Sequence, residues 1–199
     1  MRPETVCAEA AARAGPAAMS VLIETERLLL RLPRLEDAEA LLALHTDPVA
    51  MRFIGGAHPD AAADPGFVVR RWLERWEANG VGQLVAERRE DGAVLGRIGF
   101  VVWDTSVWRI TLRREAGEHA QPELGWALAR EHWGRGYATE GASAARAWAW
   151  DELRIERLIS VIAPENHRSQ RVAEKLGCLP GETVVSTDAG SAVVWVHPR

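Results

Sequence analysis

The chain has 199 residues, of which 47% are hydrophobic, so one domain with a substantial buried core is expected. The formal net charge is −4, and the only lysine among the 24 basic residues is Lys175. Because nucleic-acid affinity depends on a concentrated basic face, this balance argues against direct nucleic-acid binding.

The first 19 residues are mostly small, polar or alanine and lack the apolar stretch of a signal peptide. We interpret residues 1–19 as a disordered extension and residues 20–199 as a single domain. No run of 18 apolar residues occurs, which argues against a membrane-spanning helix. Cys7 and Cys178 match neither a disulfide framework nor a zinc site, and the histidines have no metal-ligand spacing. A cytoplasmic protein without a metal ion is therefore expected.

The first half of the domain predicts a strand, two helices and a hairpin. An apolar run over residues 24–33 predicts a strand, and helical spacing over residues 34–47 predicts the first helix. After a loop rich in glycine and proline, residues 67–80 predict a second amphipathic helix that Gly80 ends. Two β-rich runs then flank the sequence "EDG", which is typical of a hairpin.

The second half alternates strands and helices before a closing hairpin. We expect an extra strand around residues 108–112, a strand over residues 123–129, and a helix from residue 137. A buried strand over residues 157–163 precedes a helix that Asn166 caps and Gly177 stops. Two strands, over residues 182–186 and 192–197, close the chain. This order predicts a mixed α/β sheet with helices on its faces.

A short strand, the sequence "GRG" and an alanine-rich helix follow one another at residues 123–150. The first N–H groups of a helix lack internal partners, and the helix dipole adds positive potential there. Gly134 and Gly136 would therefore cradle a phosphate or pyrophosphate at the helix start, because a glycine lets an anion approach the main chain. Arg135 either adds charge at the rim or is simply solvated. A tight turn with close helix–strand packing is the alternative interpretation.

The stretch "ELGWALAREHWGRGYATEGASA", followed by "ENHRSQRVAEKLG", resembles the GNAT superfamily of N-acetyltransferases. The opening "TERLLLRLPRLEDAEALLAL" and the hairpin "VAERREDGAVLGRIGF" are similar to the RimJ/RimL branch, which acetylates ribosomal-protein N-termini. The resemblance extends over about residues 25–195. The family's loop motif is Gln/Arg-x-x-Gly-x-Gly/Ala, and this chain departs from it because Glu131 occupies the Gln/Arg position.

This resemblance implies a fold, a co-substrate and a set of binding residues. The implied fold is a mixed, mostly antiparallel central sheet that splays at its fourth and fifth strands, with helices on both faces. The implied donor is acetyl-CoA. The positions that match the family's diphosphate-binding loop are Gly134, Arg135, Gly136, Tyr137 and Ala138, and those that match its pantetheine and thioester contacts are Trp126, Ala127, Leu128 and Asn166.

Glu123 is the candidate general base, because family members often have a carboxylate at this position. A solvated acid at a strand edge beside Pro122 is the alternative, and Glu87 and Asp104 are weaker candidates for the base. Many relatives use a tyrosine to protonate the departing thiolate, but the only tyrosine here, Tyr137, lies on the phosphate-binding helix.

Ser169 is the candidate acid, because the RimJ/RimL-like branch has a serine three residues after the asparagine. Ser169 shares a helical face with Val172, Ala173 and Leu176, so its hydroxyl points inward and needs a partner. Alternatively, this hydroxyl bonds to the backbone of its own first turn. Trp72, Trp76, Arg52 and Phe53 fall where the family builds its acceptor cleft.

The sequence thus predicts an acetyl-CoA-dependent N-acetyltransferase that acts on a primary amine, either a protein N-terminus or a small molecule. No cysteine lies in the predicted catalytic strand, so direct attack in a ternary complex is expected instead of an acetyl-enzyme. The alternative is a non-catalytic acyl-CoA-binding module in which Glu123 and Ser169 are inert. The closing hairpin and the second helix are candidates for a homodimer interface.

Overall fold

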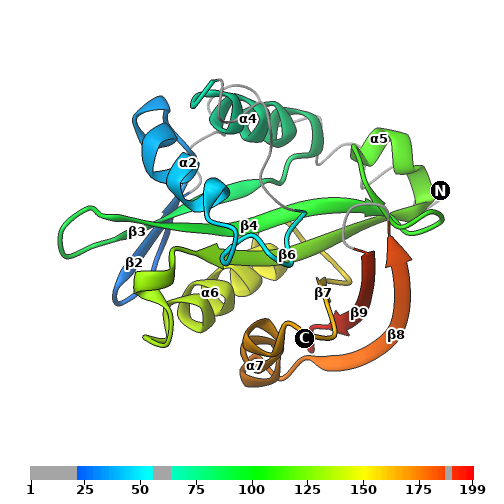
Figure 1. Ribbon diagram of the computed structural model, residues 1–199. Helices are drawn as coiled ribbons and strands as arrows, with labels where there is room; N and C mark the ends of the chain where they lie inside the picture. The colour runs from blue at the N-terminus through cyan, green and yellow to red at the C-terminus, as the bar shows by residue number, and fades with distance from the viewer. Residues whose placement is uncertain (1–21, 56–63, 187–189) are drawn as a thin grey trace.

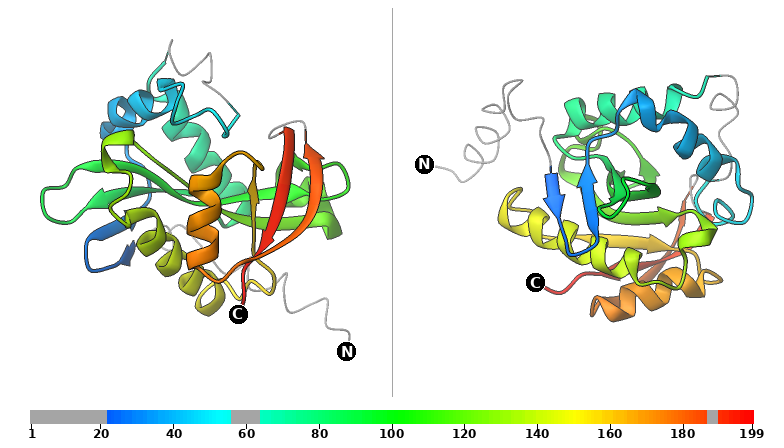
Figure 2. Two further views of the ribbon diagram at one scale, coloured as in Figure 1. Left: turned by 60° about the horizontal axis from the view of Figure 1, so that its bottom comes forward. Right: turned by 90° about the vertical axis from the view of Figure 1, so that its left-hand side faces the viewer.

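The computed structural model describes residues 22–55, 64–186 and 190–199, so the expected extension over residues 1–19 lies outside the described residues. The chain forms a mixed sheet between two layers of helices, in which α2 and α4 cover one face and α6 and α7 the other (Figures 1 and 2). The strands are β1 (Leu22–Glu24), β2 (Leu28–Arg31), β3 (Gln83–Arg88), β4 (Val94–Asp104), β5 (Arg109–Ile110), β6 (Ala120–Leu128), β7 (Ile159–Ile162), β8 (Leu179–Ser186) and β9 (Gly190–Val196). The α-helices are α2 (Ala38–Thr46), α4 (Phe67–Asn79), α5 (Arg113–Ala116), α6 (Tyr137–Asp151) and α7 (His167–Lys175).

The strand order is β1-β2-β3-β4-β6-β7-β9-β8, with β5 paired to the end of β4. All pairs of neighbouring strands in the described residues are antiparallel except β6 and β7, which run parallel. The predicted fold class, a mixed and mostly antiparallel sheet with helices on both faces, is therefore confirmed. The predicted fourth and fifth strands correspond to β6 and β7.

Most predicted elements occur where the pattern placed them, although α5 was not predicted, β8 begins at Leu179 before the predicted residue 182, and two further differences concern β1 to β2 and β6. The first predicted strand is two strands, because residues 25–27 turn and Thr25 bonds back to Leu28. Strand β6 begins at Ala120, before the predicted residue 123, and therefore contains Pro122. Pro122 pairs with Val102 of β4, while the partner strand on its other side reaches β6 only at Glu123. A proline lacks a main-chain donor, and this position does not need one toward β7.

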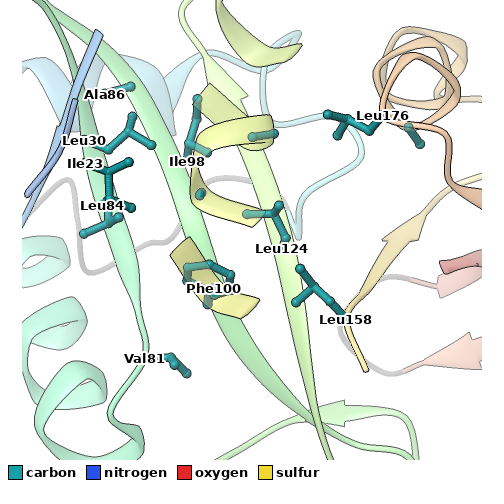
Figure 3. Close-up of a cluster of buried hydrophobic side chains, with 14 of the residues drawn as sticks. Ile23, Leu30, Val81, Leu84, Ala86, Ile98, Phe100, Leu124, Leu158 and Leu176 are labelled. Atoms are coloured by element: carbon teal, nitrogen blue, oxygen red, sulfur yellow. The ribbon is translucent and has the colours of Figure 1, made fainter. Parts of the chain in front are cut away.

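The core lies between the sheet and α6 (Figure 3). Leu30, Leu84, Ile98, Phe100 and Leu124 come from neighbouring strands and are almost completely buried. Helix α6 presents small residues to them, namely Ala142, Ala145 and Ala149, all fully buried. The small side chains let the helix axis come close to the sheet, which places the helix N-terminus at the end of β6.

Candidate active site

The sheet opens into a wedge between β6 and β7, because these strands pair only at Glu123 and Ile159. Two main-chain carbonyls of β6 on that side have side-chain partners instead. Leu124 accepts a hydrogen bond from Ser160 Oγ at 2.6 Å, and Leu128 accepts one from Trp133 Nε1 at 2.7 Å. Main-chain groups of alternate residues in a strand point the same way. Trp126, between the two, therefore points its N–H and C=O into the wedge.

A cavity of about 590 Å³ occupies this region and adjoins β6, the loop before α6, the start of α7 and the loop after α2. Most of the predicted site residues line it, namely Trp126, Ala127, Leu128, Gly134, Gly136, Tyr137, Ala138, Asn166 and Ser169. Two predicted residues, Glu123 and Arg135, are outside the lining. The structure thus brings predicted site residues from three separate stretches of chain together around one cavity.

The loop before α6 has the geometry that the glycine pattern predicts. Gly134 and Gly136 have φ angles of 75° and 84°, a left-handed conformation that costs glycine little. Within the described residues, the main-chain N–H groups of residues 134–139 have no recorded hydrogen-bond partner, and residues 134–136 are exposed. Several N–H groups and the positive end of the α6 dipole therefore face one side of the cavity, which suits a phosphate.

The side chains of the cavity lining add positive charge to that of the α6 dipole. Arg52, Arg168, Arg171 and Lys175 contribute four cations, and Glu165 is the one acidic residue of the lining. Arg168 also stacks on the ring of Trp133, with its guanidinium carbon 4.4 Å from the ring centre. Although the whole chain is acidic, the cavity therefore attracts an anionic ligand. No cluster of three or more potential metal-ligating residues occurs among the described residues.

Glu123 lies at the vertex of the wedge and not at a solvated strand edge. Its carboxylate accepts hydrogen bonds from the indole of Trp103 and, at 3.1 Å, from the main-chain N–H of Val161. Burial raises the pKa of Glu123, and this outweighs the two hydrogen bonds and the charge of Arg97, which favour the ionised form. A carboxylate with a raised pKa is a stronger base. The weaker candidates are Glu87, which pairs with Arg31, and Asp104, which caps a turn at Ser106.

Asn166 caps α7 as the sequence predicts, because its side chain accepts the N–H of Ser169 at 3.2 Å. The Ser169 hydroxyl has no recorded backbone partner within the described residues, which argues against the first-turn bond considered above. The side chain is partly buried and lines the cavity. Its hydroxyl is thus available to a bound molecule.

Comparison with known proteins agrees with this geometry. The model of the acetyltransferase (GNAT) domain family matches residues 27–179. This chain belongs to the GNAT acetyltransferases. It is 31% identical to the uncharacterized protein YkkB of Bacillus subtilis over 80% of this chain and 86% of the relative. An acetyltransferase of Agrobacterium tumefaciens has a structure with a TM-score of 0.72, at 28% identity over 90% of this chain and 95% of that one.

An aminoglycoside acetyltransferase, AAC(6′)-Ib, was solved in complex with ribostamycin and coenzyme A. It matches with a TM-score of 0.68 over 87% of this chain and 94% of that one, but at 20% identity it shows the shared fold alone. Together with relatives that are named N-acetyltransferases, the family match makes the present chain an N-acetyltransferase.

One residue that holds the loop before α6 has no signal in the sequence of the acetyltransferase. Arg27 donates from Nη1 to the carbonyl of Arg135 at 2.9 Å, pairs with Glu140 at 2.6 Å and stacks over Tyr137. Glu140 also accepts hydrogen bonds from Thr25 and from the Arg27 main chain. The turn between β1 and β2 is thereby fastened to the first turn of α6. Only the fold brings residues so distant in sequence together.

The acceptor side of the acetyltransferase differs from the prediction at two of four residues. Trp72 and Trp76 are each 7% exposed and belong to two clusters of buried core residues, and Trp76 Nε1 donates to the carbonyl of Gln83. Their placement in an acceptor cleft was wrong, because the helix turns its apolar face toward the sheet. Arg52 and Phe53 do line the cavity, together with Ile54.

The loop that carries these residues is linked to the loop before α6. Asp47 accepts the N–H groups of Val49 and Ala50 and forms an ion pair of 2.6 Å with Arg130. Arg130 begins the short 3-10 helix Arg130–His132, which leads into Gly134. The loop after α2 and the loop before α6 are therefore joined by this ion pair. No helix among the described residues is long and apolar enough to span a bilayer.

Proposed function

We propose that this protein transfers the acetyl group of acetyl-CoA to a primary amine while both substrates are bound. One observation carries the proposal: the unpaired main chain of Trp126 and the unpaired N–H groups of residues 134–139 open onto the same cavity. A coenzyme thioester needs donors for its diphosphate at one end and for its thioester oxygen at the other.

The binding roles follow from position along the cavity. Gly134, Gly136, Tyr137 and Ala138 offer main-chain N–H groups to the diphosphate, and Arg135 adds charge at the exposed rim. The pantetheine arm and the thioester would be held by Trp126, by the two residues that follow it in β6, Ala127 and Leu128, and by Asn166 at the start of α7. A Trp126 N–H aimed at the carbonyl oxygen stabilises the negative charge that develops there.

The chemical roles belong to Glu123 and Ser169. Glu123, directly or through a water molecule, takes a proton from the acceptor ammonium group so that the nitrogen becomes a nucleophile. The nitrogen then bonds to the acetyl carbon and loses its second proton to water, the carbon–sulfur bond breaks, and the departing sulfur takes a proton from a water molecule or from Ser169, which regains a proton from solvent. The position of Glu123 at the vertex of the wedge, three residues before Trp126 on the same strand, supports its role as the base.

Direct transfer is favoured over an acetyl-enzyme. Cys178 is the cysteine within the described residues, and it is buried. Burial raises the pKa of its thiol to about 11, which leaves almost no thiolate at neutral pH. Ser160 is also buried, and its hydroxyl is already engaged with Leu124 and His197. Neither group is placed to carry an acetyl group.

We favour a protein N-terminus as the acceptor, because the sequence is similar to the RimJ/RimL branch. We also favour a cytoplasmic location, because the chain has few cysteines. The test combines calorimetric titration with CoA and measurement of thiol release from acetyl-CoA with a panel of peptides, polyamines and aminoglycosides. We expect CoA binding and amine-dependent thiol release. CoA binding without release on any amine would instead support a non-catalytic acyl-CoA-binding module.

A further inference from the structure

A polar cluster lies on the face of the sheet that carries Glu123, beside the cavity wall. Arg97 of β4 is paired in register with Ala127, which lines the cavity. Arg97 Nη1 donates to Gln83 Oε1 at 2.9 Å, and Gln83 in turn donates to the carbonyl of Phe100. One end of the guanidinium is therefore fixed to β3. Its Nε and Nη2 have no recorded partner within the described residues.

Gly125 lies between Arg97 and Glu123 and leaves the space between them open. A Cβ placed on Gly125 would be 3.6 Å from Arg97 Nη1 and 3.8 Å from Glu123 Oε1. Although Gly125 is in an interior strand, it stays partly exposed. A cation and a carboxylate thus face a position where the chain has no side chain, and no ion pair between them is recorded within the described residues.

Each of the two charges suits one part of a bifunctional ligand. Burial lowers the pKa of Arg97 to about 10, so the guanidinium is cationic at neutral pH but poorly solvated. A poorly solvated cation gains more than an exposed one from an oxygen acceptor. Glu123 offers carboxylate oxygens to an amine. The gap over Gly125 is bounded by these two groups, so a ligand there meets a donor on one side and an acceptor on the other.

We propose that Arg97 and Glu123 select acceptors in which the reacting amine and a carbonyl or carboxylate oxygen are held by adjacent carbons, as in an α-amino acyl group. Arg97 donates to the oxygen, Glu123 receives the amine, and the missing side chain at Gly125 makes room for the backbone of the acceptor. The inference rests on the proposed function and specifies its substrate class. Arg97 takes no part in proton transfer and acts as a specificity residue.

The test compares alaninamide with isopropylamine, which differ only in that a methyl group replaces the carboxamide. Rates are expressed per concentration of unprotonated amine, because the two amines differ in basicity. We expect kcat/KM for alaninamide to exceed that for isopropylamine by about 10- to 100-fold, as for a hydrogen bond to a charged group. In Arg97→Met this ratio should approach one, and Arg97→Lys should restore part of it because the charge returns without the planar fork.

Exposed Arg114 supplies the matched control, since Arg114→Met removes the same charge away from the cluster and should keep the ratio of the unaltered protein. Calorimetric binding of CoA to each variant shows that its cavity is intact. Equal use of both amines by the unaltered protein, or an unchanged ratio in Arg97→Met and Arg97→Lys with CoA binding retained, overturns the inference and leaves the proposed function standing. Absence of turnover on every amine overturns the proposed function and this inference with it.

Discussion

The carboxylate of Glu123 accepts the main-chain N–H of Val161 at 3.1 Å, across the place where β6 and β7 separate. A side chain thus replaces the ladder hydrogen bond that the diverging strands cannot make. The same carboxylate is the proposed base, so one group both links the diverging strands and takes part in the proposed reaction.

The first prediction separates these two roles of Glu123. Glu123→Gln keeps one oxygen that can accept the Val161 N–H, although its amide nitrogen cannot accept the Trp103 indole, and it removes the base, so kcat should fall by about 10²- to 10⁴-fold. CoA affinity should change little, because the phosphate loop is untouched. Glu123→Ala should in addition lower the melting temperature, since it leaves that N–H and the Trp103 indole unpaired. A Glu123→Gln protein with full kcat would show that another group or water is the base.

The second prediction concerns Gly136. Gly136→Glu places a carboxylate at the N-terminus of α6, where the diphosphate is expected, and should weaken CoA binding by about 10²-fold or more because of like-charge repulsion. Gly117 offers a matched control, because it has a φ angle of 56°, open space around it, and a place between α5 and β6 outside the cavity lining. Calorimetry should show normal CoA binding for Gly117→Glu. Equal affinities for the two variants would show that the diphosphate of CoA does not bind at the loop before α6.

The third prediction tests the clamp that Arg27 forms on the phosphate loop. Arg27→Ala loses the contacts to Arg135, Glu140 and Tyr137, and the dissociation constant for CoA should rise about three- to tenfold, as expected for a half-exposed ion pair. Arg114→Ala removes an exposed charge away from both the loop before α6 and the β1–β2 turn, and it should bind CoA normally. If both variants lose affinity equally, net charge and not the clamp is responsible.

The fourth prediction concerns Ser169. Ser169→Ala keeps the main-chain N–H that Asn166 caps, so α7 and CoA binding should be preserved. If the hydroxyl protonates the departing sulfur, kcat should fall by about 10²-fold, which is the lower range for general acid catalysis. Stopped-flow measurement of thiol release gives the turnover rate, and calorimetric titration gives the affinity for CoA. Intact turnover would mean that water protonates the sulfur.

The fifth prediction is a pH dependence of stability that comes from His197. Ser160 Oγ donates its proton to Leu124, so His197 Nε2 must donate to Ser160, and the buried Nδ1 has no partner within the described residues. Burial, with help from the charge of Arg146, lowers the pKa of His197 to about 4. The unfolded chain, with a pKa of about 6.5, binds the proton more readily. Stability is therefore complete above about pH 6.5 and is lost as the pH falls toward 4.

The shift in the pKa of His197 lowers the unfolding free energy by roughly 3 kcal/mol at most as the pH falls toward 4. His197→Gln keeps a donor for Ser160 and cannot titrate, so its unfolding free energy should fall less between pH 6.5 and 4 than that of the unaltered protein. Urea unfolding across this pH range measures the slope. The exposed His119→Gln should behave like the unaltered protein, and a His197→Gln protein with the same slope would contradict the assignment.

Local features of the chain were predictable because they depend on neighbouring residues. The left-handed glycines before α6, the Asn166 cap and the helix over residues 67–79 follow from backbone conformation and periodicity within a few turns. The sequence by itself therefore determined the conformation of the glycines before α6, the order of the elements and the likeness to the acetyltransferase family.

Only the tertiary structure decided which distant side chains meet. The Arg27 clamp joins residues far apart in the chain, and the Arg97 cluster depends on the register of β3, β4 and β6. Trp72 and Trp76 were placed in a cleft although they are core residues, because the sequence shows the apolar face of a helix but not which surface of the fold that face packs against. Strand register and helix orientation arise from the packing of the whole core, and no local pattern encodes them.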